Sequence, residues 1–230
     1  MVYLVGAGPG AADLITVRGA RLLAQANIVL HDALVTEDML ALCPQAIKVN
    51  VGKRSGQRSA AQEHINQQII AAAQEHAIVV RLKGGDPMLF GRADEEMSAM
   101  EQAGIRFDIV PGITTALAAA SAVQLPLTKR GVARSVALFT SSTAPGEAQE
   151  TRIPDCDTLV QYMGGKEAQL TAERMLAKGY PASHPITIVE SCSLSTQRHQ
   201  HLTLAELAHG LPACDGPVLV MMGEAMRGRK

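Results

Sequence analysis

The chain opens with Val2-Tyr3-Leu4-Val5-Gly6-Ala7-Gly8-Pro9-Gly10, a short apolar run followed directly by three glycines. The apolar run predicts a buried strand over Val2–Val5, and the glycines predict a tight loop. Apolar residues recur at helical spacing in Thr16–Ala26, which predicts a helix. Strand, glycine loop and helix in this order are typical of the first unit of an open α/β sheet.

The same alternation continues as far as Val110. Apolar and β-branched runs predict further strands at Ile28–Leu30, Ile47–Val51, Ile78–Leu82 and Phe107–Val110. Helices are predicted between them, near Glu37–Leu42, Ala60–Glu75 and Asp94–Ala103. Strands that alternate with helices form parallel sheets covered by helices. We therefore predict an α/β fold whose first domain, residues 1–124, contains a mainly parallel sheet.

The second half of the chain predicts a smaller, mixed α/β domain. A linker is predicted at residues 125–131, Leu-Pro-Leu-Thr-Lys-Arg-Gly, and the second domain at residues 132–230. The patterns that follow predict strands and helices at Val136–Thr140, Thr158–Met163, Glu167–Lys178, Ile186–Val189, Leu204–His209 and Val218–Met222.

Glycine follows three of the predicted strands of the first domain. The segments are Gly6–Gly10, Gly84-Gly85-Asp86-Pro87 and Pro111-Gly112. Glycine lets a backbone approach a ligand closely, and ligands of such sheets bind outside the carboxyl ends of the strands. Three glycine loops at the ends of one sheet therefore predict a single binding site.

The first loop also fits the dinucleotide-binding pattern G-x-G-x-x-[G/A], with Asp32 at the end of the second predicted strand. An oxidoreductase that binds NAD or FAD is therefore an alternative. Two features count against it. Pro9 has no N–H to offer a pyrophosphate, and Ala11–Thr16 delays the helix whose N-terminus would bind it. A sulfonium cofactor carries no phosphate and needs neither feature.

Composition excludes several classes of function. The formal net charge is −1 and the chain contains no Trp, so nucleic acid is not an expected partner. No apolar run reaches the length of a membrane span, and the start has no basic n-region of a signal peptide. The cysteines are scattered, and we interpret His199-Gln200-His201 as a surface loop, so no metal site is predicted. We expect a cytoplasmic protein.

Several motifs occur in a fixed order along the chain. They are Leu4–Gly10, Val51-Gly52-Lys53-Arg54, Arg81–Pro87, Phe90-Gly91-Arg92, Val110–Thr114, Pro126-Leu127-Thr128, Tyr162-Met163-Gly164 and Val189-Glu190. Together they resemble the tetrapyrrole methylase family, and most narrowly the branch whose members methylate uroporphyrinogen III. The resemblance runs from about Val2 to Gly223.

The resemblance implies a two-domain tetrapyrrole methylase-like fold, a homodimer and a cleft between the domains. It implies S-adenosylmethionine as methyl donor, S-adenosylhomocysteine as product, and two methyl transfers that convert uroporphyrinogen III to precorrin-2 for sirohaem or cobalamin. The implied catalytic and substrate residues are Asp32, Lys53, Arg92 and Glu95. The implied cofactor-binding residues are Pro9, Gly84, Gly85, Asp86, Leu89, Thr114, Thr115, Met163 and Cys192.

The chemistry of methyl transfer suits these residues. Positive charge develops on the pyrrole ring as it gains a methyl group, and a nearby carboxylate can stabilise that charge or remove a proton. We assign this role to Asp32, whose alternative is a loop or cap residue. The substrate carries eight carboxylates, which arginine and lysine side chains can bind. Basic residues gather in stretches of sequence that contain no Asp or Glu, and Arg81, Lys83 and Arg92 lie beside the second glycine loop.

The chain departs from the family's pattern at four places. The family usually has Tyr-Asp-Arg at His31-Asp32-Ala33 and Gly-Gly at Ala93-Asp94. It usually has Gly-His at Ser141-Ser142 and Gly at Cys192. Two further alternatives therefore stand beside the uroporphyrinogen III enzyme. One is a divergent tetrapyrrole methyltransferase with other regiochemistry, and the other is a non-catalytic sensor that binds tetrapyrrole or cofactor.

Overall fold

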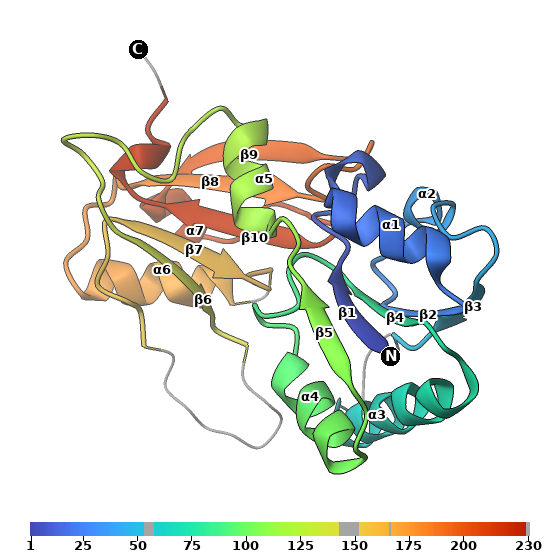
Figure 1. The fold of residues 1–230 in the computed structure, drawn as a ribbon. Coiled ribbons are helices and arrows are strands. Elements are labelled where there is room, and N and C mark those ends of the chain that lie inside the picture. Colours follow the sequence, from blue (N-terminus) through green and yellow to red (C-terminus); the bar gives the residue numbers. More distant parts are fainter. Residues whose placement is uncertain (53–57, 143–151, 166, 229–230) are drawn as a thin grey trace. The chain divides into compact units, whose positions relative to one another are not determined.

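The computed structural model describes residues 1–52, 58–142, 152–165 and 167–228, without the side chains of 58–61. The chain forms two compact units, Met1–Thr114 and Thr115–Lys230 (Figure 1). Each unit has its own five-stranded sheet, so we describe each by itself. No helix in the described part of the chain is long and apolar enough to cross a bilayer.

The first unit contains a fully parallel sheet, as predicted. Its strands lie in the order β3-β2-β4-β1-β5. The register pairs Val2 with both Val79 and Phe107, and Ile28 with both Ile47 and Val79. The bounds are β1 (Val2–Gly6), β2 (Ile28–His31), β3 (Ile47–Asn50), β4 (Val79–Lys83) and β5 (Phe107–Val110).

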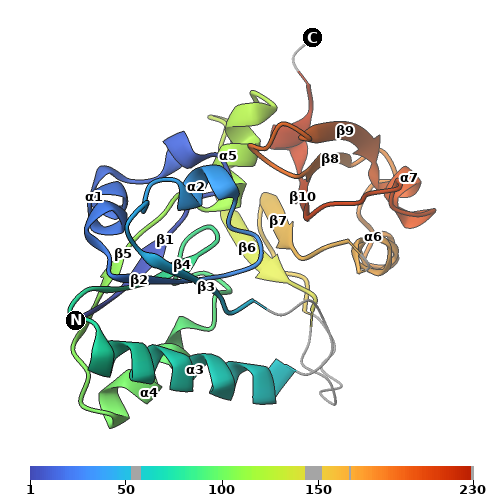
Figure 2. The same cartoon turned by 90° about the vertical axis from the view of Figure 1, so that its right-hand side faces the viewer.

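Helices cover both faces of this sheet (Figure 2). They are α1 (Val17–Gln25), α2 (Glu37–Leu40), α3 (Arg58–Glu75) and α4 (Ala93–Gln102). Successive strand residues point to opposite faces, so Val5 packs in a core cluster with residues of α1 and α2, while Leu4 packs with residues of α3 and α4. The short 3₁₀ turn η1 (Ala12–Leu14) separates the first glycine loop from α1, whose N-cap is Thr16.

The second unit is mixed α/β, also as predicted. Its sheet has the order β6-β7-β10-β8-β9, with β6 and β7 parallel and the remaining pairs antiparallel. The bounds are α5 (Thr115–Ala122), β6 (Val136–Thr140), β7 (Thr158–Tyr162), α6 (Ala168–Ala177), β8 (Pro185–Glu190), β9 (Arg198–Thr203), α7 (Leu204–Ala208), β10 (Val218–Met222) and η2 (Glu224–Met226).

The prediction of a surface loop at His199-Gln200-His201 was wrong. These residues form part of β9, an edge strand that pairs with β8. The strand gives no apolar signal because its first four residues, Arg198–His201, are exposed. Strand pairing at an edge satisfies backbone groups without requiring an apolar face.

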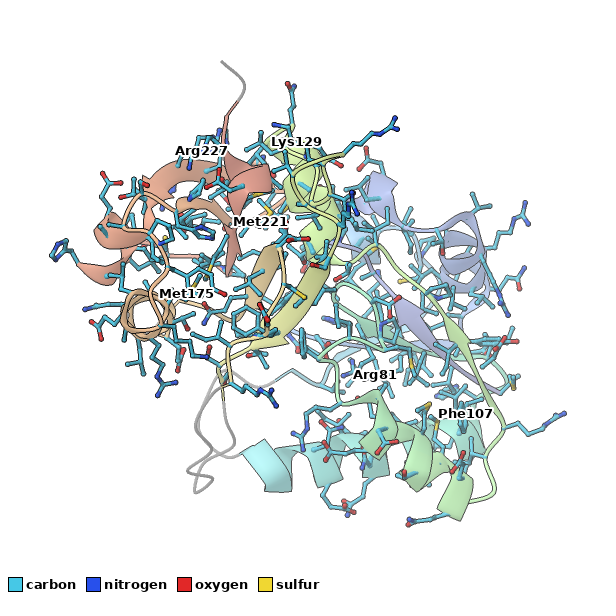
Figure 3. All side chains as sticks on the ribbon, turned by 90° about the vertical axis from the view of Figure 1, so that its left-hand side faces the viewer. Arg81, Phe107, Lys129, Met175, Met221 and Arg227 are labelled. Carbon is cyan, nitrogen blue, oxygen red and sulfur yellow. The ribbon has the colours of Figure 1, made fainter. Side chains whose placement is uncertain are left out.

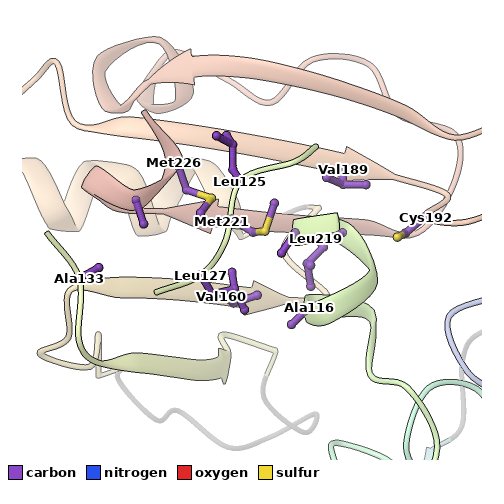
Figure 4. Packing of buried hydrophobic residues seen from close by; sticks show 13 residues of the cluster. Ala116, Leu125, Leu127, Ala133, Val160, Val189, Cys192, Leu219, Met221 and Met226 are labelled. Carbon is purple, nitrogen blue, oxygen red and sulfur yellow. The ribbon is translucent and has the colours of Figure 1, made fainter. Parts of the chain in front are cut away.

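The segment predicted as a linker contributes to the core of the second unit. Leu125 and Leu127 are buried in the same cluster as Ala116 of α5, Val160 of β7 and Met221 of β10 (Figure 4). The compact second unit accordingly begins at Thr115. The predicted boundary after residue 124 lies between α5 and this buried segment.

Candidate functional site

The carboxyl ends of the five parallel strands meet at one edge of the first unit. Because all five strands are parallel, the loops that follow Gly6, His31, Lys83 and Val110 leave the sheet at the same edge. These loops contain most of the first-unit residues that the sequence assigned to a site. The residues that were predicted to bind a ligand are therefore expected to lie close together at this edge.

Backbone hydrogen bonds join the first two glycine loops. Gly8 N–H donates to the Gly85 carbonyl at 3.1 Å, and Gly85 N–H donates to the Gly8 carbonyl at 2.7 Å. Both residues have positive φ, 77° and 68° respectively, which glycine adopts without a steric penalty. Ala7 N–H also donates to the Lys83 carbonyl at 2.7 Å, so the β1–β4 pairing continues into the loops.

The third glycine loop packs directly on the first two. A Cβ atom on Gly112 would lie 2.3 Å from the Gly85 carbonyl oxygen and 2.8 Å from Gly6 Cα. Both neighbours are backbone atoms, so neither could move aside as a flexible side chain would. Gly6 and Gly112 are required because the three loops approach each other, not because a ligand approaches them.

The Asp86 side chain joins the second glycine loop to the third by a hydrogen bond. Its Oδ1 accepts a hydrogen bond from Met88 N–H at 2.8 Å, and its Oδ2 accepts one from Gly112 N–H at 2.9 Å. The residue predicted to bind cofactor thus has a structural role within the unit. Its part in cofactor binding stays a prediction.

Gly84 and Gly85 present bare backbone to open space. A Cβ on Gly85 would meet no atom within 4 Å, and one on Gly84 would meet Leu34 Cβ at 4.0 Å. Cβ atoms on Gly6, Gly8 and Gly112 would instead meet protein backbone within 3.1 Å, so Gly84 and Gly85 are the positions that leave room for a ligand. Half-buried Pro9, Leu89 and Thr114 belong to the loops that flank this backbone.

Asp32 belongs to a buried network of charges behind the same edge. Its Oδ1 lies 2.5 Å from Nη2 of Arg81, a side chain only 2% exposed that extends from β4 toward α4 (Figure 3). Arg81 Nε donates to Glu96 Oε1 at 3.1 Å, and Lys83 Nζ lies 2.8 Å from the same oxygen. Asp32 is the most exposed of the four, with 32% of its side chain accessible.

Arg81 and Lys83 were predicted to be cations that could face a polyanionic substrate, and the structure corrects this. Both are buried on the α3 and α4 face of the sheet and paired with Glu96. Strand alternation places residues 79, 81 and 83 on one face, and that face is covered by helices. Burial, together with the neighbouring Arg81 charge, lowers the pKa of Lys83, although Glu96 opposes the shift.

Glu96 compensates two buried cations, so its removal has a predictable cost. We expect Glu96→Ala to lower the free energy of unfolding by about 3–5 kcal/mol, because Arg81 and Lys83 would lose their buried counter-ion. The matched control is Glu95→Ala, one position earlier on α4. Its exposed pair with Arg92 should contribute about 1 kcal/mol or less. Urea unfolding of both variants measures the difference, and equal losses would show that the buried network adds nothing.

Arg92 and Glu95 pair with each other at the start of α4. Two hydrogen bonds of 2.6 Å join the guanidinium to both carboxylate oxygens, and this pairing lowers the pKa of Glu95. Both side chains are exposed, at 40% and 48%. Both side chains are thus accessible at the surface of the unit. Lys53 lies outside the described residues.

In the second unit, two of the three predicted cofactor residues lie near the start of α5. Ala116 N–H, next to Thr115, donates to the Tyr162 hydroxyl at 2.9 Å. Met163 follows directly, with φ of 54° and half of its surface exposed. Cys192 is buried in the same core cluster as Ala116, and burial raises the pKa of its thiol. Thr115 and Met163 are thus each next in sequence to a member of the Ala116–Tyr162 hydrogen bond, whereas Cys192 lies in the core cluster that contains Ala116.

The departures from the family pattern have local explanations. His31 Nδ1 lies 3.1 Å from the Asp32 carbonyl oxygen, and Ala93, the first residue of α4, packs in the core. Ser141 hydrogen-bonds to buried Gln161 at 2.7 Å. Ser191 and Ser193 have positive φ, but Cys192 between them does not, so that position accepts a side chain. Each departure is therefore accommodated by the fold.

Comparisons with known proteins agree with this architecture. The family model "Tetrapyrrole (Corrin/Porphyrin) Methylases" matches residues 1–208. The structure of a Thermus thermophilus uroporphyrin-III C-methyltransferase complexed with S-adenosylhomocysteine has a TM-score of 0.85 and 38% identity, covering 98% of this chain and 93% of that one. A cobalt precorrin-4 methyltransferase has a TM-score of 0.82 and 26% identity, covering 99% and 96% respectively.

A siroheme synthase from Salmonella typhi is 40% identical over 228 residues, which is 98% of this chain and 50% of that protein. The chain thus spans about half the length of the curated relatives it matches. Because the family model and the structural relatives extend over nearly all of both units, this chain belongs to the tetrapyrrole (corrin/porphyrin) methylase family.

Proposed function

We propose that this chain transfers two methyl groups from S-adenosylmethionine to uroporphyrinogen III and produces precorrin-2. The observation that carries the proposal is the bare Gly84-Gly85 backbone at the same sheet edge as the anchored, half-exposed carboxylate of Asp32. The names of the Thermus thermophilus relatives supply the substrate and the cofactor. Sirohaem or cobalamin biosynthesis, a cytoplasmic location and a homodimer are parts of the same proposal.

The first loop suits a cofactor without phosphate better than a dinucleotide. Pro9 offers no N–H, and the loop runs into η1, so α1 begins only at Val17. The N-terminus of α1 is capped by Thr16 Oγ1, which accepts from Gly19 N–H at 3.1 Å. A pyrophosphate at the loop would therefore lack the helix N-terminus that binds it in dinucleotide enzymes.

The open backbone fits the cofactor. We assign its binding to Pro9, Gly84, Gly85, Asp86, Leu89 and Thr114 of the first unit, and the assignment of Thr115, Met163 and Cys192 of the second unit remains a prediction. When bound, S-adenosylmethionine supplies a methyl group on a positively charged sulfur. Backbone amides and carbonyls hold such a molecule in place without bulky side chains, and correct placement supplies much of the rate of a displacement reaction.

Asp32 is the group we assign to the charge that develops on the substrate. A new carbon–carbon bond leaves positive charge on the pyrrole ring, and a fixed carboxylate stabilises that charge and accepts the proton that is released. Arg92 and Glu95, exposed at the start of α4, and Lys53 are assigned to substrate contact and proton transfer. Uroporphyrinogen III offers carboxylates that an arginine can bind with two hydrogen bonds.

Calorimetry with two ligands tests the cofactor assignment against the dinucleotide alternative. We expect S-adenosylhomocysteine to bind the purified chain and NADH not to bind, because the loop lacks the phosphate-binding features. The two titrations use the same protein sample, so protein quality affects both equally. Tight binding of NADH without any response to S-adenosylhomocysteine would contradict the proposal and favour an oxidoreductase.

A further inference from the structure

We propose that Arg81 is a positioning residue for Asp32: one buried guanidinium fixes the direction of the carboxylate at the sheet edge. The inference rests on the proposed function, because it assigns a task to Arg81 within that reaction. The motivation is the path of hydrogen bonds that starts at half-buried Asp32 and ends in the interior at Glu96.

Each nitrogen of the Arg81 guanidinium donates a hydrogen bond. Nη2 bonds to Asp32 Oδ1 at 2.5 Å, and Nε bonds to Glu96 Oε1 at 3.1 Å. Nη1 donates to the Leu82 carbonyl at 3.2 Å and lies 3.5 Å from the Leu30 carbonyl. Leu30 precedes Asp32 by two residues along the chain, so Arg81 holds both the end of β2 and the side chain that follows it.

The opposite side of Arg81 is also fixed. Glu96 is fully buried, and its Oε1 receives Lys83 Nζ at 2.8 Å and Gln62 Nε2 at 3.4 Å as well as Arg81. Within the described residues, Glu96 Oε2 has no hydrogen-bond partner. Glu96 therefore depends on the two cations, and it holds Arg81 against the sheet.

A planar guanidinium suits this position because it bonds in several fixed directions at once. A lysine ammonium is a single point charge on a flexible stem, and one such group could not reach Asp32, Glu96 and two carbonyls together. The neighbouring Lys83 illustrates the difference, since its Nζ donates a hydrogen bond to Glu96 while Asp32 acts on it only as a nearby charge. Arg81 thus hydrogen-bonds to both Glu96 and Asp32, whereas Lys83 hydrogen-bonds to Glu96.

A double-mutant cycle on the full chain tests this inference. The variants are Arg81→Met, Asp32→Asn and the double variant, with wild type as reference. If Arg81 acts through Asp32, Arg81→Met should lower kcat about tenfold or more in the wild-type background, but less than about threefold once Asp32 is asparagine. Affinity for S-adenosylhomocysteine should be unchanged in all four proteins, since the glycine loops are intact.

Lys83→Met is the matched control, because it removes a buried cation from the same Glu96 oxygen. Its effect on kcat should add to that of Asp32→Asn. Additive losses for Arg81→Met as well would overturn the inference and leave Arg81 a stabilising residue. If Arg81→Met does not fold, Arg81→Lys replaces it in the cycle, because it keeps a cation beside Glu96 and loses the bridge.

Crystal structures of wild type and the Arg81 variant give a readout that does not depend on turnover. We expect the Asp32 carboxylate to leave its wild-type rotamer when Arg81 is replaced. An unchanged rotamer would overturn the inference even if activity falls. A wild type that binds S-adenosylhomocysteine but does not methylate uroporphyrinogen III would instead contradict the proposed function, while the rotamer comparison would still decide the role of Arg81.

Discussion

Asp32→Asn should lower the rate of methyl transfer about 10²-fold or more, the size of a typical general acid–base contribution. Asparagine has nearly the same shape as aspartate but carries no charge and accepts no proton. The hydrogen bond from Arg81 to the side-chain oxygen can persist, so the variant should fold normally. Steady-state kinetics with uroporphyrinogen III and calorimetry with S-adenosylhomocysteine measure the two expected results, a lower kcat and an unchanged cofactor affinity.

The control is Asp38→Asn, which removes an exposed carboxylate from the first turn of α2 in the same unit. We expect it to leave kcat within about twofold of wild type, since it only weakens a favourable charge at a helix N-terminus. Near-normal turnover in Asp32→Asn would show that Asp32 is a loop residue. The proton would then leave through another group or directly to water.

Gly85→Val is expected to abolish cofactor binding. A Cβ on Gly85 would meet no protein atom within 4 Å, so the added side chain would occupy the open space that we assign to the cofactor. The β-branched side chain of valine is bulky next to the backbone, which makes the obstruction larger than that of alanine. Calorimetry with S-adenosylhomocysteine gives the result directly.

Backbone strain must be separated from obstruction, because Gly85 has φ of 68°. Gly104→Val is the matched control, since Gly104 has φ of 67° and also meets nothing within 4 Å. It lies between α4 and β5, at the opposite edge of the sheet. Both variants should lose similar stability, but only Gly85→Val should lose cofactor affinity. Equal affinities in the two variants would remove the Gly84-Gly85 loop from the binding site.

The sequence allowed the first sheet and its glycine loops to be predicted because both signals are local. Strand β1 and the loop after it are adjacent in the chain, and apolar residues at helical spacing mark the helices between strands. The sequence also indicated that Gly6–Gly10, Gly84-Gly85 and Pro111-Gly112 belong together. It could not distinguish glycines that pack on one another, such as Gly6 and Gly112, from Gly85, which faces open space.

The charge network could not be predicted, because it is made by residues far apart in sequence. Asp32, Arg81 and Glu96 come from the end of β2, from β4 and from α4. One local signal existed: Arg81 and Lys83 alternate with apolar residues in a strand that should be buried on both faces. Charged residues at such positions need a buried partner, and this rule could have placed them in the interior.

Helix α5 was missed for a different reason. Its sequence, Thr115–Ala122, is almost uniformly small and apolar, so it shows no difference between one face and the other. Strand β9 was missed because its exposed polar residues carry no strand pattern. In both elements tertiary contacts determine the structure, through packing against the core for α5 and pairing with β8 for β9.

An anaerobic assay of the purified chain with uroporphyrinogen III and isotopically labelled S-adenosylmethionine, followed by mass spectrometry of the product, tests the proposed methyl transfer directly. We expect a tetrapyrrole that has gained two labelled methyl groups, together with formation of S-adenosylhomocysteine. A product with one or three added methyl groups would indicate a family member with another regiochemistry. No methyl transfer from a chain that binds S-adenosylhomocysteine would contradict the proposed activity and favour a non-catalytic binding role.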